Sequence, residues 1–265
     1  MTEPGIVFLM YHELELPMRP LCQAEPGYVR YILTQESFRS QMRWLVQNGW
    51  RGLRVGEALA YPSEKSVAIT FDDGCETDLI AAAPILKENG LLATFYVTAG
   101  FLSNSGYMSS AQLRELHALG FEIGCHSMTH AYLDDLDPPA LRREIFDARK
   151  KLEDITGGKI EHFSCPGGRY DERTRNLVRE AGYRSMATSR TRANSPATDP
   201  YSLGRIAILR DTNVDSFGRV CRAESLWQMR LGENLRDAAK RVMGNTTYDR
   251  FRSFLLRPPR PTNCG

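Results

Sequence analysis

Short, continuous apolar runs alternate with segments of helical periodicity along most of this chain. The runs are rich in β-branched and aromatic residues and end in polar residues, which is typical of strands buried on both faces of a sheet. We predict strands over residues 6–12, 66–73, 93–99, 122–126, 162–166, 184–187 and 205–209.

Between these runs, apolar residues recur at helical spacing, and the ends of the helices are marked. Ser109 and Gln112 form a capping box, and a glycine follows each periodic segment. We predict helices over residues 38–49, 109–120, 137–157 and 171–182.

This alternation predicts a parallel sheet with right-handed crossovers. About seven strand–helix units and the lack of a dinucleotide-type glycine loop favour a closed or nearly closed β/α barrel, with an open doubly wound sheet as the second interpretation. A barrel of this kind carries its reactive groups at the carboxyl ends of its strands, so the chemistry is sought there.

Composition is that of an ordinary globular protein, but the charge is uneven. The 265 residues are 42% hydrophobic and carry a formal net charge of +2. Residues 219–260 hold ten Lys or Arg against four Asp or Glu, a net of +6. We therefore divide the chain into a barrel, residues 1–215, and a basic helical C-terminal extension, residues 216–265.

The extension has two interpretations. Residues 225–243 form an amphipathic pattern, which suits a helix packed on the barrel or a basic interfacial helix on an anionic membrane. No groove-reading module is recognisable, so nucleic acid is not an expected partner. With no secretory leader and no bilayer-length apolar run, we expect a cytoplasmic protein, with peripheral membrane association left open.

The six cysteines are widely spaced and include no C-x-x-C pair. We expect reduced thiols, because disulfide frameworks belong to short secreted chains. A thiol-rich metal site is the less favoured interpretation, because the spacings match no structural zinc site.

Three predicted strands end in polar or turn-forming residues: Asp72-Asp73-Gly74, His126-Ser127-Met128-Thr129-His130 and Pro166-Gly167-Gly168-Arg169-Tyr170. Two histidines four residues apart and one carboxylate are the ligand set of a catalytic divalent metal. One aspartate is then a ligand and its neighbour a general base. Taken singly, each motif is more often a turn or a surface feature, but together they favour a metal site.

At these residues the chain resembles the polysaccharide deacetylases of carbohydrate esterase family 4. Thr70-Phe71-Asp72-Asp73-Gly74 matches the family's first motif and His126–His130 its second, within a resemblance over roughly residues 6–210. The resemblance implies a distorted (β/α)7 barrel with Asp72 as catalytic base. It also implies that Asp73, His126 and His130 bind zinc or another divalent ion, such as cobalt or nickel.

The third motif of the family departs from its usual pattern, because Ser164 occupies the place of an arginine that orients the catalytic aspartate. Arg169 is our candidate substitute, and with Tyr170 a candidate substrate contact. Arg205 is either structural or paired with a site carboxylate. The backbone N–H of Gly167 stays available to stabilise an oxyanion, since that role needs no side chain.

The family's terminal Leu-x-His motif is absent, since no histidine follows His162. His12 closes the first predicted strand on the catalytic side. We predict that it acts as the substitute acid or contacts substrate, with a plain structural role as the alternative.

The function implied is removal of an N-acetyl group from an amino-sugar residue of a polysaccharide or lipid-linked glycan. One alternative is a glycan-binding protein that keeps the fold without turnover. Another is hydrolysis of a different small acyl amide.

Overall fold

The computed structural model describes residues 5–61, 63–224, 226 and 230. The strands are β1 (Val7–Tyr11), β2 (Leu14–Glu15), β3 (Leu33–Thr34), β4 (Arg51–Leu53), β5 (Ser66–Phe71), β6 (Thr94–Val97), β7 (Glu122–Cys125), β8 (His162–Ser164), β9 (Ser185–Ala187) and β10 (Ile206–Ala207). The α-helices are α1 (Pro26–Val29), α2 (Gln35–Gln47), α3 (Val55–Ala60), α4 (Ala83–Glu88), α5 (Ser110–Ala118), α6 (Pro138–Arg142), α7 (Ala148–Thr156), α8 (Glu172–Glu180) and α9 (Val214–Cys221). Helical turns of the 3-10 or π type are η1 (Asp78–Ala82), η2 (Leu133–Asp135), η3 (Arg143–Asp147), η4 (Pro166–Gly168) and η5 (Pro200–Ser202).

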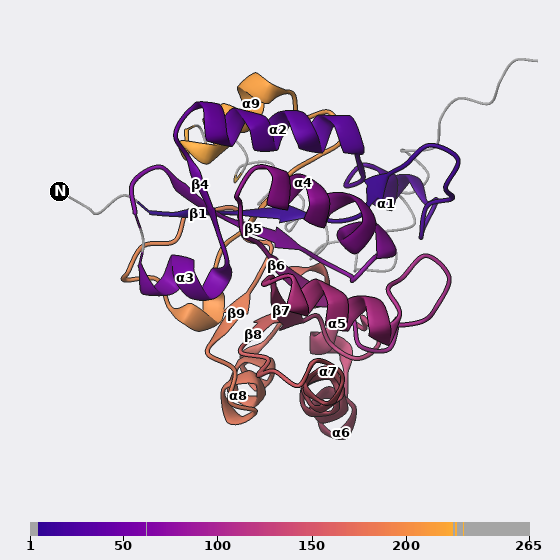
Figure 1. Cartoon of the computed structure of the whole chain (residues 1–265). Coiled ribbons are helices and arrows are strands. Elements are labelled where there is room, and N and C mark those ends of the chain that lie inside the picture. The colour runs from indigo at the N-terminus through magenta and orange to yellow at the C-terminus, as the bar shows by residue number, and fades with distance from the viewer. Residues whose placement is uncertain (1–4, 62, 225, 227–229, 231–265) are drawn as a thin grey trace, which may run out of the picture.

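One parallel sheet organises the molecule. Its strand order is β10-β1-β5-β6-β7-β8-β9, with β4 also paired to β5. Helices surround the strands in Figure 1. Because the connections between neighbouring strands cross over the sheet, all its strands point in one direction and their carboxyl ends gather at one edge.

The two ends of the sheet meet. The N–H of Leu203 donates to the carbonyl of Met186 at 3.0 Å, and the N–H of Thr188 donates to the carbonyl of Leu203 at 2.9 Å. The chain then runs directly into β10, which pairs with β1. The sheet therefore curls into the distorted β/α barrel expected from the sequence.

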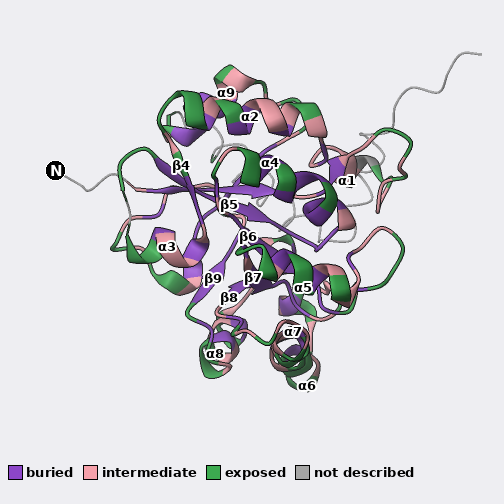
Figure 2. Ribbon diagram, viewed as in Figure 1, coloured by how far each residue is buried: buried purple, intermediate pink, exposed green. Residues whose placement is uncertain are grey.

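Most strand residues are buried, as the purple of the strands in Figure 2 shows. On β1 and β5, Leu9 and Ile69 belong to a large cluster that also contains residues of the surrounding helices. Phe8 and Ala68, one position earlier, belong to a smaller cluster with Tyr96. Successive side chains point to opposite faces, so the smaller cluster lines the inside of the barrel.

The predicted strands and helices are confirmed, with boundaries shifted by a few residues. The helices α3, α4 and α9 and the turns η1, η2, η4 and η5 are not among the predictions. The other segments not predicted are short: β2 and β3 have two residues each, β4 has three and α1 has four. In elements of this length, neither the period of a strand nor that of a helix can repeat.

The start of the C-terminal extension is structured. In α9, Phe217 is fully buried, with its ring 5.7 Å from that of Trp44 on α2. The helix predicted over residues 225–243 lies almost wholly outside the described residues, and the boundary after residue 215 stays a prediction. Within the described part of the chain, no helix combines the length and the apolar character that crossing a membrane needs.

Candidate metal centre and active site

The turn after β5 brings two consecutive carboxylates to one place. Asp72 continues the strand alternation into the barrel, whereas Asp73 has φ 81° and Gly74 has φ 82°. The left-handed backbone of Asp73 turns its side chain away from the opposite face that an extended strand would impose. At Gly74, a Cβ would lie 2.9 Å from Cγ1 of Val97, so the turn also needs a glycine.

The two histidines lie on the loop after β7, and hydrogen bonds to Glu144 hold this loop in place. Ser127 and His130 have positive φ values, 68° and 64°. The carboxylate of Glu144 accepts from the N–H groups of Met128 and Thr129 at 2.9 and 2.8 Å, and from the Thr129 hydroxyl at 2.7 Å. A loop this strained keeps its shape because the surrounding hydrogen bonds hold it.

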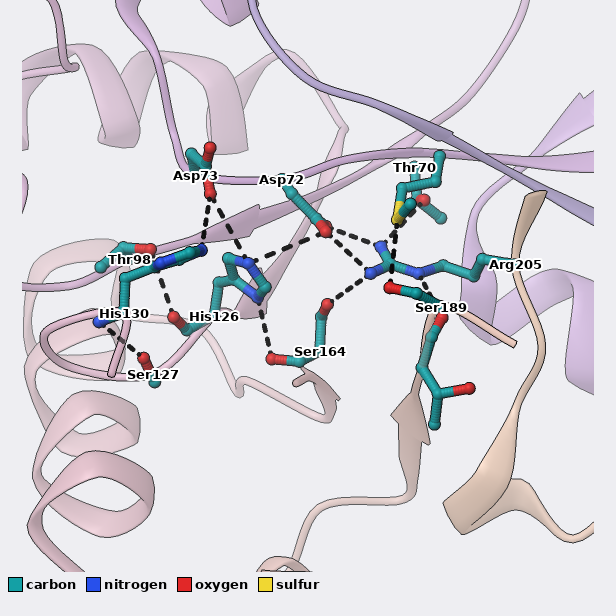
Figure 3. A network of polar contacts seen from close by, with 12 residues as sticks. Thr70, Asp72, Asp73, Thr98, His126, Ser127, His130, Ser164, Ser189 and Arg205 are labelled. Carbon is teal, nitrogen blue, oxygen red and sulfur yellow. Dashed lines mark hydrogen bonds and ion pairs between the residues drawn. The ribbon is translucent and has the colours of Figure 1, made fainter. Parts of the chain in front are cut away.

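The three predicted ligands converge. Asp73 Oδ1 lies 3.5 Å from Nε2 of His126 and 3.4 Å from Nε2 of His130. His126 Nδ1 hydrogen-bonds the carbonyl oxygen of Ser164 at 2.8 Å, which aims Nε2 at the carboxylates. Figure 3 shows this arrangement, with Asp72 next to the group.

The donors fit a divalent ion. One carboxylate oxygen and two imidazole nitrogens lie within 4.8 Å of one another. Asp73 Oδ1 is buried without a hydrogen-bond partner. Burial lowers the pKa of His126 to about 4, although Asp72 opposes the shift. The imidazole is therefore neutral at pH 7, the form that binds metal.

Asp72 lies between His126 and Arg205, and Arg205 holds it in place. The guanidinium donates to both carboxylate oxygens, at 2.6 and 2.7 Å, and also to Oγ of Ser164 at 2.8 Å. Burial raises the pKa of Asp72, but the charge of Arg205 and its hydrogen bonds outweigh the effect of burial and hold the pKa well below its usual range. Asp72 is thus a fixed, ionised carboxylate.

The substitute arginine is Arg205, and the prediction that Arg169 takes this role is wrong. Arg169 donates to Asp134 at 3.0 and 3.1 Å and to Asp135 at 2.8 Å. Its guanidinium also lies 4.3 Å from the ring of Tyr132. Of the two interpretations open for Arg205, pairing with a site carboxylate is confirmed.

Gly167 lies in the tight turn η4 next to the site. Its φ is 60°, and a Cβ there would approach Cε1 of Tyr132 to 2.8 Å. The turn uses the N–H groups of Gly168 and Arg169, which donate to Cys165 and Pro166. The oxyanion role of the Gly167 N–H stays a prediction.

His12 follows β1 at the catalytic edge. Its Nδ1 is buried without a hydrogen-bond partner, and its ring lies 5.1 Å from that of Tyr31. Burial lowers the pKa of His12, against the opposing effect of Asp73 and Asp72. Tyr28, which sequence reasoning missed, donates from its hydroxyl to Asp73 Oδ2 at 3.1 Å. No pattern around Tyr28 signals this contact.

Two other predicted positions are now located. The hydroxyl of Tyr170 lies 3.1 Å from that of Ser202, and its substrate role stays a prediction. His162 is at the opposite end of the barrel, where Nδ1 hydrogen-bonds Ser185 at 2.8 Å and Nε2 lies 3.5 Å from Glu122. His162 is therefore outside the site.

Comparison with known proteins agrees with this geometry. A sequence profile of the polysaccharide deacetylase family matches residues 60–186. YxkH of Bacillus subtilis, named as a polysaccharide deacetylase, is 30% identical over 190 residues, which cover 69% of this chain and 68% of YxkH. The chain belongs to the polysaccharide deacetylase family. These proteins are hydrolases of N-acetyl amides and generally depend on a divalent metal.

Other relatives match in part or in fold. A chitooligosaccharide deacetylase of Azorhizobium caulinodans is 33% identical over 129 residues, 48% of this chain and 60% of that protein. The Streptococcus pyogenes deacetylase PplD, solved with acetate, superposes with a TM-score of 0.73 at 24% identity. That superposition covers 82% of this chain and 98% of PplD, and it establishes the fold.

Proposed function

We propose that this polysaccharide deacetylase removes the N-acetyl group from amino-sugar residues of an oligo- or polysaccharide, with Asp72 as its general base. The observation that carries the proposal is the ionised Asp72, which lies 3.7 Å from Nε2 of His126 at the edge of a three-ligand group. The chitooligosaccharide deacetylase among its relatives supports the class of substrate.

We assign Asp73, His126 and His130 as the ligands of one divalent ion, with zinc the best match to this nitrogen and oxygen donor set. When bound, such an ion polarises the acetamide carbonyl and makes a bound water more acidic. The chain's own contribution is to keep His126 neutral and to hold Asp73 Oδ1 free of other partners.

Asp72 takes a proton from the attacking water. Arg205 holds both of its oxygens, so the carboxylate cannot rotate and stays ionised in the free enzyme. The N–H of Gly167 donates to the oxygen that becomes negative as the carbonyl carbon turns tetrahedral. Arg205 fixes Asp72 before substrate arrives, which lowers the reorganisation that the reaction needs.

His12 acts on the amine side of the scissile bond. Its lowered pKa makes it neutral at pH 7, so it must gain a proton before it can protonate the leaving amine. Alternatively, the N–H of the neutral His12 imidazole hydrogen-bonds the bound sugar without proton transfer. Products of the reaction are acetate and a free amino sugar.

The test replaces Asp72 by Asn and measures acetate release from N-acetylated chitooligosaccharides together with metal content. We expect the rate to fall by roughly 10²- to 10⁴-fold, the usual contribution of a general base, while the metal stays bound. Asp211→Asn, at an exposed aspartate, is the matched control and should keep full activity. Full activity in Asp72→Asn would contradict the assignment.

The acid released from the substrate separates the alternatives. Wild-type protein that binds metal and N-acetylated glycans but releases no acetate from any of them is a glycan-binding protein. Release of another acid, such as formate, from the corresponding amide would instead identify a deacylase of different substrate class.

A further inference from the structure

A second group of metal-ligating side chains lies beside the active site. Glu13 follows β1, Cys75 follows the Asp72-Asp73-Gly74 turn, and Cys22 comes from the loop between β2 and α1. Their carboxylate oxygen and two sulfur atoms all lie within 4.8 Å of one another, the same limit that the Asp73 group meets. Glu13 and Cys75 are buried and Cys22 is half-buried.

Hydrogen bonds hold Cys22 next to Glu13 and next to the loop at Gly106. Its N–H donates to both carboxylate oxygens of Glu13, each at 3.0 Å. Its sulfur lies 3.1 Å from the carbonyl oxygen of Gly106, where φ is 88° and a Cβ would come within 2.7 Å of that sulfur. The loop around residue 106 is therefore shaped to admit the thiol.

A buried carboxylate without partners adjoins this group. Asp78 is fully buried, and neither of its carboxylate oxygens has a hydrogen-bond partner. Burial raises the pKa of Asp78, and Asp73, Cys22 and Glu13 raise it further, so it faces the same acidic group. Arg19, whose charge reaches Glu13, is paired with Glu76 instead. A buried polar group left this way is unfavourable unless something compensates it.

We propose that Glu13, Cys22 and Cys75 bind a second divalent ion, next to the unpartnered carboxylate of Asp78. Two sulfur donors select zinc over magnesium or calcium. Cys22 and Cys75 lie far apart in the chain, so the short Cys-x-x-Cys spacing of common zinc motifs does not appear.

The second site is linked to the proposed metal ligand Asp73 through the side chain of Tyr28. The Tyr28 hydroxyl, which donates to Asp73 Oδ2, lies 3.9 Å from Cys75 Sγ. An ion at Cys22 and Cys75 would anchor the loop that leads into α1 and so hold Tyr28 against Asp73. This consequence rests on the proposed function, whereas ion binding itself does not.

Cobalt titration tests the proposal. Metal-free wild-type protein should bind two equivalents of Co²⁺, one of which gives the near-ultraviolet absorption of thiolate-to-cobalt charge transfer. Cys22→Ser and Cys75→Ser should each lose this absorption and one equivalent. Cys221→Ser, at a buried thiol on α9, is the matched control and should keep both. His126→Gln should lose the other equivalent and keep the absorption.

Three results would overturn the proposal. They are binding of a single equivalent without thiolate absorption, absorption that persists in Cys22→Ser, and a Cys22–Cys75 disulfide found by mass spectrometry of unreduced protein. Cys22 is half-buried, so Cys22→Ser keeps the test usable if Cys75→Ser fails to fold. Failure of the proposed function would appear as absent acetate release and would leave the thiolate absorption in place.

Discussion

Asp72 and Arg205 form a fully buried ion pair whose members lie 133 positions apart in the chain. The Ser164 hydroxyl accepts from the same guanidinium at 2.8 Å, at the position where the sequence resemblance leads us to expect an arginine. Removing one partner of such a pair leaves an uncompensated buried charge, which is strongly destabilising. In this chain the arginine is residue 205, and its charge lies against the carboxylate that we propose as the general base.

An exchange of the two residues tests this relation. Arg205→Ser should lower acetate release by roughly 10- to 100-fold, the usual effect of losing a partner that orients a site group. The double variant Arg205→Ser with Ser164→Arg should recover part of that activity, because the guanidinium is restored from β8. Arg222→Ser, at an exposed ion pair with Glu224, is the control. A double variant no better than Arg205→Ser, although folded by circular dichroism, would count against positioning.

His12→Gln distinguishes the two roles of His12. Glutamine keeps a hydrogen-bond donor but transfers no proton, so an acid role predicts a loss in kcat of about 10²-fold or more. A contact role predicts a nearly unchanged kcat and a changed KM. Steady-state kinetics on a soluble N-acetylated oligosaccharide measure both values. If neither value changes, His12 has a structural role.

The elements that carry the site end in strained turns. Asp73 after β5, Ser127 and His130 after β7, and Gly167 after β8 all have positive φ. Left-handed residues other than glycine are disfavoured and persist where the surroundings over-determine them. The regular strands set the distance between these ends, and the turns set the direction of each side chain.

Gly167→Ala tests the turn after β8. A Cβ at this residue combines an unfavourable φ with a 2.8 Å approach to Tyr132, so we expect the peptide to shift and kcat to fall about 10-fold or more. Gly157→Ala is the control, because Gly157 has φ 70° at the end of α7 with nothing within 4 Å of the added Cβ. It should lose about 1 kcal/mol of stability and no activity. Equal kinetics in the two variants would refute the oxyanion role.

At the scale of the whole molecule, the barrel encloses ionisable groups as well as apolar side chains. Arg205, Asp72 and His126 are each at most 2% exposed. Their protonation is therefore coupled to folding, because the unfolded chain returns each group to its ordinary pKa.

The free energy of unfolding of metal-free protein should fall as the pH decreases from about 6.5 to 5. In this window the unfolded chain binds a proton at His126, whose folded pKa is about 4, and the folded chain does not. At about 1.36 kcal/mol per pH unit, the loss from this residue is about 2 kcal/mol. Asp72 titrates below the window, since its folded pKa is held well below its usual range.

Urea unfolding at pH 7 and pH 5 measures this loss in the presence of a chelator. His126→Gln is the control, because its amide does not titrate and the variant should show a smaller difference between the two pH values. His12, whose pKa is also lowered, contributes with the same sign to both proteins. Identical pH dependence in wild type and His126→Gln would show that His126 is not held neutral.

The sequence by itself determined the barrel, its main strands and helices, and the candidate metal ligands. Each of these depends on residues that are neighbours in the chain. Apolar runs form buried strands, a capping box starts a helix, and four residues separate His126 from His130. Polar residues directly after parallel strands must gather at one edge, so the convergence of Asp73 with these histidines was also predictable.

Only the tertiary structure decided the partner of Asp72 and the Glu13, Cys22 and Cys75 group. Arg205 reaches Asp72 because the strand order of the sheet places β10 beside β1 and β1 beside β5. Cys22 reaches Glu13 and Cys75 through a loop that no periodicity describes. Contacts across a closed sheet depend on which strands become neighbours, and spacing along the chain does not encode that choice.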